Sequence, residues 1–257
     1  MEPECFKSMT KLIPATHPRL KSLLIREKLI NGFSRGLVAR EGLIAHGRGE
    51  AFDYLLGEKT SAFAMDATQA AAATLLLAKQ PIISVNGNVA AISATDIIKL
   101  SKYANAPLEV NLFYRDKQRE QAIERELLKY GATKVYGVGP FASAKLPDLD
   151  SERRKVDPRG ILVADVVVVP LEDGDRAEAL VKMGKKIIAI DLNPLSRTAS
   201  IADITIVDNI TRAIPRLIYA IKRLNNISHE EQQKIVGKFD NKRVLAKSLE
   251  IIRGAMS

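Results

Sequence analysis

Residues 164–192 read ADVVVVPLEDGDRAEALVKMGKKIIAIDL, and this stretch decides the fold class. It opens on a run of valines, continues through DRAEALVKMG with the spacing of a helix, and ends on the apolar run KKIIAID. Strands that are apolar on both faces need a covering layer on each side, which is typical of parallel sheets. The stretch therefore predicts part of a mainly parallel, doubly wound α/β sheet of the Rossmann-like kind.

The same alternation extends in both directions along the chain. Helical spacing predicts helices over 19–36, 61–80, 94–106, 120–131 and 210–225. Apolar runs predict strands over 82–85, 108–114, 133–138 and 203–208. We expect one α/β domain over residues 1–257, with a core of about 17–225 that begins in a helical segment and a helical tail of about 226–257.

Composition excludes several classes of protein. The 257 residues are 46% hydrophobic, which is enough to fill a sizeable core. A single cysteine rules out an internal disulfide, and three scattered histidines cannot build a soft-metal cluster, so any metal should be oxygen-ligated, such as Mg²⁺. No apolar run approaches the ~18 residues of a membrane span, and the N-terminus does not resemble a signal peptide. We expect a cytoplasmic protein.

The net charge of +9 raises the question of nucleic-acid binding. The excess of lysine and arginine lies in residues 1–48 and 222–257, whereas the remaining chain balances 22 basic against 22 acidic residues. The sequence also lacks tryptophan and the aromatic motifs of common RNA-binding modules. A nucleic-acid partner is therefore disfavoured, and charged helix faces explain the basic ends better.

Polar side chains gather where the predicted strands end. Since parallel strands present their carboxyl ends at one edge of a sheet, these side chains should meet in one crevice. Each of them alone could equally be a turn former or a helix cap, but five strand ends of this type favour a shared site. The residues are Asn86 and Asn88; Asn111 and Arg115; Glu172, Asp175 and Arg176; Asn193 and Arg197; and Asp208 and Asn209.

The loop DLNPLSRT, residues 191–198, suits a phosphate group. Arg197 adds a fixed positive charge beside backbone amides, and Asn193 can donate to a phosphate oxygen without the repulsion that a carboxylate would bring. Asp191 and Asp208 suit a ribose hydroxyl or hydrated Mg²⁺.

A second segment, GLIAHGRGEAFDYLLG at residues 42–57, is rich in glycine. Gly47 and Gly49 flank Arg48, which predicts a turn that brings backbone close to a ligand, followed by a short helix from Glu50. His46 could act as a base near neutral pH or be structural.

Residues 137–160 lack a helical or strand period. They open with GVGPFA, which matches a dinucleotide-binding pattern, but Pro140 spoils the helix that the pattern requires. The chain also has no P-loop motif. A loop of this length in a compact domain is usually functional or mobile.

Together the motifs resemble one known family. SLLIREKLINGF, GLIAHGRGEAFDYLLGE, ISVNGNVAA, EVNLFYR and IAIDLNPLSRTASIADITIVDNITRAIPR are similar, over about residues 17–216, to the archaeal phosphopantothenate synthetase (4-phosphopantoate:β-alanine ligase) family. The resemblance implies a homodimeric, ATP-dependent ligase of coenzyme A biosynthesis. Such an enzyme joins 4-phosphopantoate to β-alanine as an amide, through an acyl adenylate, and releases AMP and pyrophosphate.

The resemblance also implies roles for individual residues. The positions matching the family's ATP site are Arg26, Arg48, Asp191, Leu192, Asn193, Arg197, Thr198, Asn209 and Ile210. Arg153 and Lys155 match positions that we assign to phosphopantoate, and Asn86, Asn88, Asn111, Arg115 and Arg176 complete the expected substrate site. Arg48, with Mg²⁺, should screen the anions, whereas the base that deprotonates the amine is left open among His46, Glu172 and Asp175.

One alternative from another class remains at this point. A nucleotide-binding regulatory protein without catalysis could use the same fold, because fold alone does not determine activity.

Overall fold

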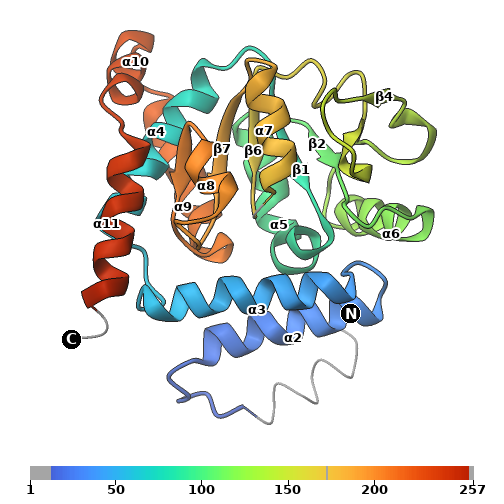
Figure 1. Ribbon diagram of the computed structural model, residues 1–257, viewed down its shortest axis with the longest axis horizontal. Helices are drawn as coiled ribbons and strands as arrows, with labels where there is room; N and C mark the ends of the chain where they lie inside the picture. The colour runs from blue at the N-terminus through green and yellow to red at the C-terminus, as the bar shows by residue number, and fades with distance from the viewer. Residues whose placement is uncertain (1–12, 172, 255–257) are drawn as a thin grey trace.

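A six-stranded parallel sheet forms the centre of the computed structural model, which describes residues 13–171 and 173–254 (Figure 1). Its strand order is β3-β2-β1-β6-β7-β8. Counted along the chain, these strands follow the order 3-2-1-4-5-6 of the doubly wound Rossmann fold, which confirms the predicted fold class. The strands are β1 (Pro81–Val85), β2 (Leu108–Val110), β3 (Val135–Tyr136), β6 (Val166–Val169), β7 (Lys186–Ile190) and β8 (Ile204–Ile206).

The valine run that decides the fold occupies β6, near the middle of the sheet. Val166 and Val168 belong to one apolar core, and Val167 and Val169 belong to the core on the other face. Successive side chains of a strand point to opposite faces of the sheet. Because both faces are covered here, all four valines are buried. Burying a valine side chain contributes about 1.5–3 kcal/mol, so this strand stabilises both layers at once.

Helices cover both faces of the sheet. The larger core lies under α4 (Ala62–Leu77), α5 (Gly87–Tyr103), α6 (Lys117–Lys129) and α9 (Ile210–Leu224). The smaller core lies under α7 (Gly174–Lys182) and the segment that follows β3. Of Thr60 and Ser61, which both precede the alanine-rich run, it is Ser61 that caps α4 by accepting from the backbone N–H of Ala64, at 3.1 Å.

Two N-terminal helices, α2 (Leu20–Ser34) and α3 (Arg40–Leu55), lie side by side below the sheet in Figure 1. Gly36, the last residue of the range predicted for this helix, closes α2 with a φ of 73°. The prediction of a glycine turn within 42–57 is wrong, since Gly47 and Gly49 lie inside a continuous helix. Glycine lowers helix propensity, but tertiary contacts override it here: Glu50 and Asp53 of α3 are buried and bound to arginines of other helices.

Two other boundaries differ from the sequence expectation. The helix predicted over 94–106 begins earlier, at Gly87, because the Asn86 side chain accepts from the Val89 N–H and caps it. The strand predicted over 108–114 ends at Val110, after which the chain leaves the sheet toward α6. The earlier helix start places Asn86 at the N-terminus of α5, and the shorter strand places Asn111 at the sheet edge rather than inside a strand.

The C-terminal tail forms α10 (His229–Gly237) and α11 (Asn241–Gly254), and both pack against α4. Asn241 joins α11 to the sheet, because its Oδ1 accepts from the Thr205 N–H at 2.7 Å and its Nδ2 donates to the carbonyls of Ala199 and Ala202 at 3.0 Å. Within the described ranges, no helix combines the length and apolar character needed to cross a bilayer.

Candidate active site

A cavity of about 500 Å³ opens at the carboxyl edge of the sheet, where β1 and β6 lie side by side. At this position the chain reverses its direction across the sheet, so the loops after β1 and β6 diverge and leave a crevice. Helix α3 supplies one wall through residues such as Gly42, His46 and Gly49. The cavity therefore lies where ligands bind in folds of this class.

Three helix N-termini open onto this cavity. Gly87 of α5, Gly174 of α7 and Ile210 of α9 are each the first residue of their helix, and all three line the cavity. A Cβ on Gly87 would lie 2.0 Å from the Leu37 carbonyl oxygen, so the backbone approach there requires glycine. Helix N-termini attract anions through their dipoles and backbone amides, so the site suits phosphate groups.

Most of the predicted site residues line the cavity. They are His46, Arg48, Asn86, Asn88, Arg153, Asp175, Asp191, Leu192, Asn193, Arg197, Asn209 and Ile210. Glu172 lies outside the described residues, and the remaining six do not line the cavity. The roles assigned to the lining residues stay predictions, while the convergence of residues from four of the five predicted strand ends, those of β1, β6, β7 and β8, is an observed property of the fold.

The loop after β7 is held in one shape by its own polar groups. Asp191 accepts from the backbone N–H of Asn193 at 2.9 Å and from the Ser196 hydroxyl. Ser196 in turn caps the short helix α8 (Arg197–Ile201). Arg197 projects from this loop, pairs with Asp175, and is 64% exposed, so its guanidinium is accessible to a ligand.

Arg26 does not line the cavity and is bound to Glu50 instead. Its Nε lies 2.9 Å from both carboxylate oxygens of Glu50, and Arg19 contacts the same carboxylate at 3.1 Å. In this arrangement Arg26 fixes α2 against α3. Its predicted contact with ATP stays a prediction.

Asn111 and Arg115 support the loop at residues 137–160 instead of facing the cavity. Asn111 Nδ2 donates to the Arg153 carbonyl at 2.9 Å, and Arg115 donates to the carbonyls of Lys155 and Gly137. The loop contains the short antiparallel strands β4 (Ala144–Lys145) and β5 (Lys155–Val156). It serves the site by bringing Arg153 to the cavity, whereas Arg115 and Lys155 line a separate, more open hollow.

Arg176 and Thr198 are buried behind the cavity wall. Arg176 is 1% exposed and contacts the Ser84 hydroxyl at 2.7 Å and Asp173 at 2.5 Å. The Thr198 hydroxyl accepts from the Asp173 N–H at 2.7 Å. Asp173 lines the cavity and also pairs with Arg153 at 2.7 Å. Both residues therefore position Asp173 and, through it, Arg153.

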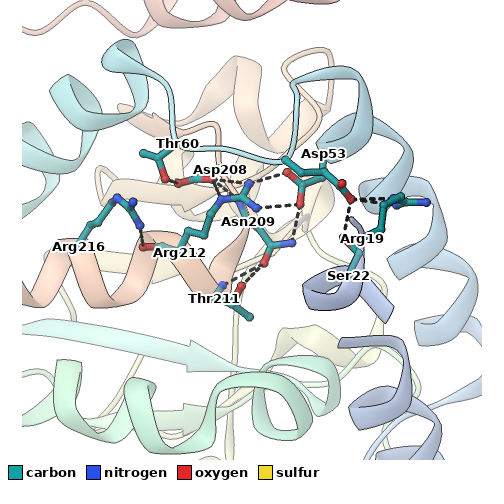
Figure 2. A network of polar contacts seen from close by, with 10 residues as sticks. Arg19, Ser22, Asp53, Thr60, Asp208, Asn209, Thr211, Arg212 and Arg216 are labelled. Atoms are coloured by element: carbon teal, nitrogen blue, oxygen red, sulfur yellow. Dashed lines mark hydrogen bonds and ion pairs between the residues drawn. The ribbon is translucent and has the colours of Figure 1, made fainter. Parts of the chain in front are cut away.

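A network of buried charges joins α3 to the N-terminus of α9 (Figure 2). Asp53 accepts from Asn209 Nδ2 at 2.9 Å and from Arg212 Nη2 at 2.5 Å. Arg212 also contacts Asp208, which accepts from the Thr60 hydroxyl at 2.6 Å. Asn209 is thus held by its side chain in front of the cavity, which fixes the position of the α9 amides.

His46 faces the cavity from α3 in a partly buried position. Burial lowers its pKa, although the nearby Glu50 acts in the opposite direction. Among the described residues, no hydrogen-bond partner is found for its buried Nε2. A lowered pKa favours the neutral imidazole, which is the form that can accept a proton.

Lining residues missed from the sequence include Glu41, Phe113 and Arg119. Asp173 and Tyr114 also line the cavity; the sequence places both at strand ends, Asp173 within the acidic run after β6, but no role was assigned to either. Phe113 and Tyr114 follow β2, but the expected strand over 108–114 concealed their loop position. Glu41 and Arg119 lie on helices, where no sequence pattern separates them from ordinary surface charges.

Glu109 is a buried carboxyl that anchors the loop carrying Arg153. It lies in β2 and accepts from the backbone N–H groups of Asp157 at 3.0 Å and Ile161 at 2.6 Å. A Cβ on Gly160 would lie 1.9 Å from its Oε2, so the loop closes tightly over it. Burial raises the pKa of Glu109 to about 7, despite these hydrogen bonds.

This raised pKa predicts a pH dependence of stability. The folded protein holds the Glu109 proton up to about pH 7, whereas the unfolded chain releases it near pH 4.5. Stability from this group is therefore full below about 4.5 and falls as pH rises toward 7, with a slope of up to about 1.4 kcal/mol per pH unit. We expect urea unfolding between pH 4.5 and 8 to show a smaller decline for Glu109→Gln. Equal slopes in both proteins would contradict this prediction.

Comparisons with known proteins find relatives of this chain over most of its length. The family model described as phosphopantothenate/pantothenate synthetase matches residues 63–255. A relative from Thermococcus kodakarensis, named 4-phosphopantoate–β-alanine ligase, is 53% identical over 95% of this chain and 94% of its own. Relatives of the same name from Methanosarcina mazei and Methanospirillum hungatei are 48% and 52% identical, over 94% and 80% of this chain and 94% and 83% of their own.

Proposed function

Because the chain belongs to the phosphopantothenate/pantothenate synthetase family, it is a ligase that joins 4-phosphopantoate to β-alanine in coenzyme A biosynthesis, and we propose that the cavity between β1 and β6 is its active site. One observation supports this placement most strongly. Three helix N-termini and the arginines Arg48, Arg119, Arg153 and Arg197 converge on that one cavity, where two anionic substrates would need them.

We propose that ATP activates the substrate carboxylate. A carboxylate oxygen attacks the α-phosphorus, the bond to the β-phosphate breaks, and pyrophosphate leaves with the bonding electron pair. ATP carries about four negative charges and the phosphate of phosphopantoate nearly two, so cations must lower the repulsion before attack. Arg48, in the middle of α3, and Arg197, at the end of the loop after β7, are placed for this role.

The second step forms the amide. The neutral amine of β-alanine attacks the acyl carbon, the bond to AMP breaks, and the nitrogen loses a proton. His46 is the best-placed acceptor among the described candidates, because burial lowers its pKa and so favours the neutral imidazole, whereas Asp175 is paired with Arg197.

Magnesium would enter with the nucleotide. In the described part of the chain, no three histidine, cysteine, aspartate or glutamate side chains are grouped to hold a metal ion. Mg²⁺ commonly keeps several waters and binds phosphates plus one or two carboxylates. Asp173, Asp175, Asp191 and Asp208 line the cavity and fit that limited requirement. Bound Mg²⁺ would lower the charge on the phosphates.

The deciding experiment is AMP release with each substrate omitted in turn. We expect AMP only when ATP and 4-phosphopantoate are present, with steady turnover only when β-alanine is added. Tight ATP binding without AMP would instead indicate a regulatory nucleotide-binding protein. A nucleic-acid binder would show an affinity for DNA or RNA that falls steeply with salt.

Removing either cavity arginine should weaken the use of ATP. We expect Arg48→Ala and Arg197→Ala each to lower kcat/KM for ATP by a factor that corresponds to about 1–3 kcal/mol, because each removes a charge-assisted contact to phosphate. Both side chains lie at the cavity surface, so thermal unfolding should change little. Arg125→Ala, on the exposed side of α6, is the control. Kinetics equal to the control, or unfolding of either variant, would contradict the assignment.

Three further expectations are kept as proposals. We propose that the enzyme is a homodimer, as the family resemblance implies, that it acts in the cytoplasm, and that its 257 residues form one domain.

A further inference from the structure

The cavity has two ends that differ in the elements forming them. One end is built by the loops after β7 and β8, with Asn193 and Asn209, which the family resemblance assigns to ATP. The other end is built by the segment between β2 and α6 and by the loop that carries Arg153. Asn86 and Asp173 lie at the ends of the two central strands between them. If ATP occupies the first end, the phosphorylated acid must occupy the second.

Two arginines line this second end, and their surroundings differ. Arg153 is already paired with Asp173, whose same Oδ2 also contacts Arg176. Arg119, on the first turn of α6, has a side chain that is 12% exposed. Within the described chain, its side chain forms one ion pair, in which Nε lies 3.9 Å from Asp116 Oδ2, too far for a hydrogen bond.

The charge of Arg119 is therefore sheltered from water but weakly compensated. Burial lowers its pKa, while the carboxylates of Asp116 and Glu41 act in the opposite direction. Asp116 caps α6 by accepting from the Arg119 N–H at 2.9 Å, so one of its oxygens is already used. A desolvated guanidinium facing a cavity is a strong partner for a dianion, which it can bind through two parallel hydrogen bonds.

We propose that Arg119 binds the phosphate group of the acyl substrate and so makes the enzyme select the phosphorylated acid. This inference rests on the proposed function and goes beyond it, because it assigns the second anion to a residue that the family motifs did not indicate. Phe113 and Tyr114, which pack edge to face at 5.0 Å, line the same end and would flank the carbon skeleton.

The test compares Arg119→Gln and Arg119→Lys with Arg125→Gln, an exposed arginine on the same helix. We expect Arg119→Gln to raise KM for 4-phosphopantoate about 10- to 100-fold and to leave KM for ATP and β-alanine within about twofold of wild type. Arg119→Lys should recover part of the loss, since lysine keeps the positive charge but lacks the planar guanidinium that forms two parallel hydrogen bonds.

A pH profile separates the phosphate from the substrate carboxylate. The second pKa of a phosphate monoester is about 6, so lowering the pH from 7.5 to 5.5 should raise KM for 4-phosphopantoate in the wild type and less in Arg119→Gln. An unchanged KM, a parallel rise of KM for all three substrates, or identical pH profiles would overturn the inference. Absence of AMP release by the wild type would instead refute the proposed activity, so the two failures are distinguishable.

Discussion

Asp53→Ala is expected to lower the free energy of unfolding by about 3–5 kcal/mol. Asp53 is 1% exposed and accepts from both Asn209 and Arg212. Removing its carboxylate leaves the Arg212 guanidinium, which is largely buried, with Asp208 as its remaining carboxylate. Burial by itself lowers the pKa of Arg212, and the hydrogen bonds of Asp53 and Asp208 more than reverse this. The charge of Arg212 is therefore stabilised by both carboxylates.

The control for this variant is Asp66→Ala, an exposed aspartate on α4. Denaturant unfolding of the two variants should differ by several kcal/mol, with Asp66→Ala within about 0.5 kcal/mol of the wild type. Asp53→Asn should recover part of the loss, because its carbonyl oxygen can still accept from Asn209. A loss below 1 kcal/mol for Asp53→Ala would show that the network of Figure 2 does not hold α3 against α9.

The strands and their edge residues were predictable because they follow from chemistry along the chain. Four consecutive valines can be buried only between two layers, and that requirement identified β6 without any tertiary information. Parallel strands place their carboxyl ends together, so Asn86, Asn193 and Asn209 could be assigned to one crevice before its shape was known.

Only the last part of α3 was predicted, as a short helix from Glu50, because the stability of the whole helix comes from residues far away in the chain. Local propensity at Gly47 and Gly49 favours a turn. The contacts that override it are those of Glu50 with Arg26 and of Asp53 with Arg212. Such pairs join residues separated by 24 and 159 positions, and no local pattern contains them.

Side-chain direction was the second unpredictable property. Asn111 and Arg115 lie next to a strand end, as expected, but their polar atoms turn to the carbonyls of another loop. Arg176 and Thr198 likewise do not line the cavity but contact residues of its wall. The sequence identifies residues near an edge, whereas the packing around each one decides whether it faces the ligand or supports a neighbour.

Asp173→Ala is expected to reduce both stability and activity, because Asp173 faces two arginines and the cavity. Arg176 is 1% exposed, and burial lowers its pKa to about 10 even with Asp173 present. Without that carboxylate the buried cation loses its main partner, which should cost about 3–5 kcal/mol in urea unfolding. Arg153 loses its 2.7 Å contact at the same time, so kcat/KM for 4-phosphopantoate should fall at least as far as in Arg153→Ala.

The double variant Asp173→Ala, Arg176→Met separates these two effects. Replacing a buried ion pair by an apolar side chain of similar length is often close to neutral, so the double variant should regain most of the stability lost by Asp173→Ala. It should not regain activity, because Arg153 still lacks the carboxylate that orients it. Recovery of activity together with stability would mean that Asp173 acts only through the fold. Loss of activity in a stable double variant would show that the carboxylate positions Arg153 at the cavity.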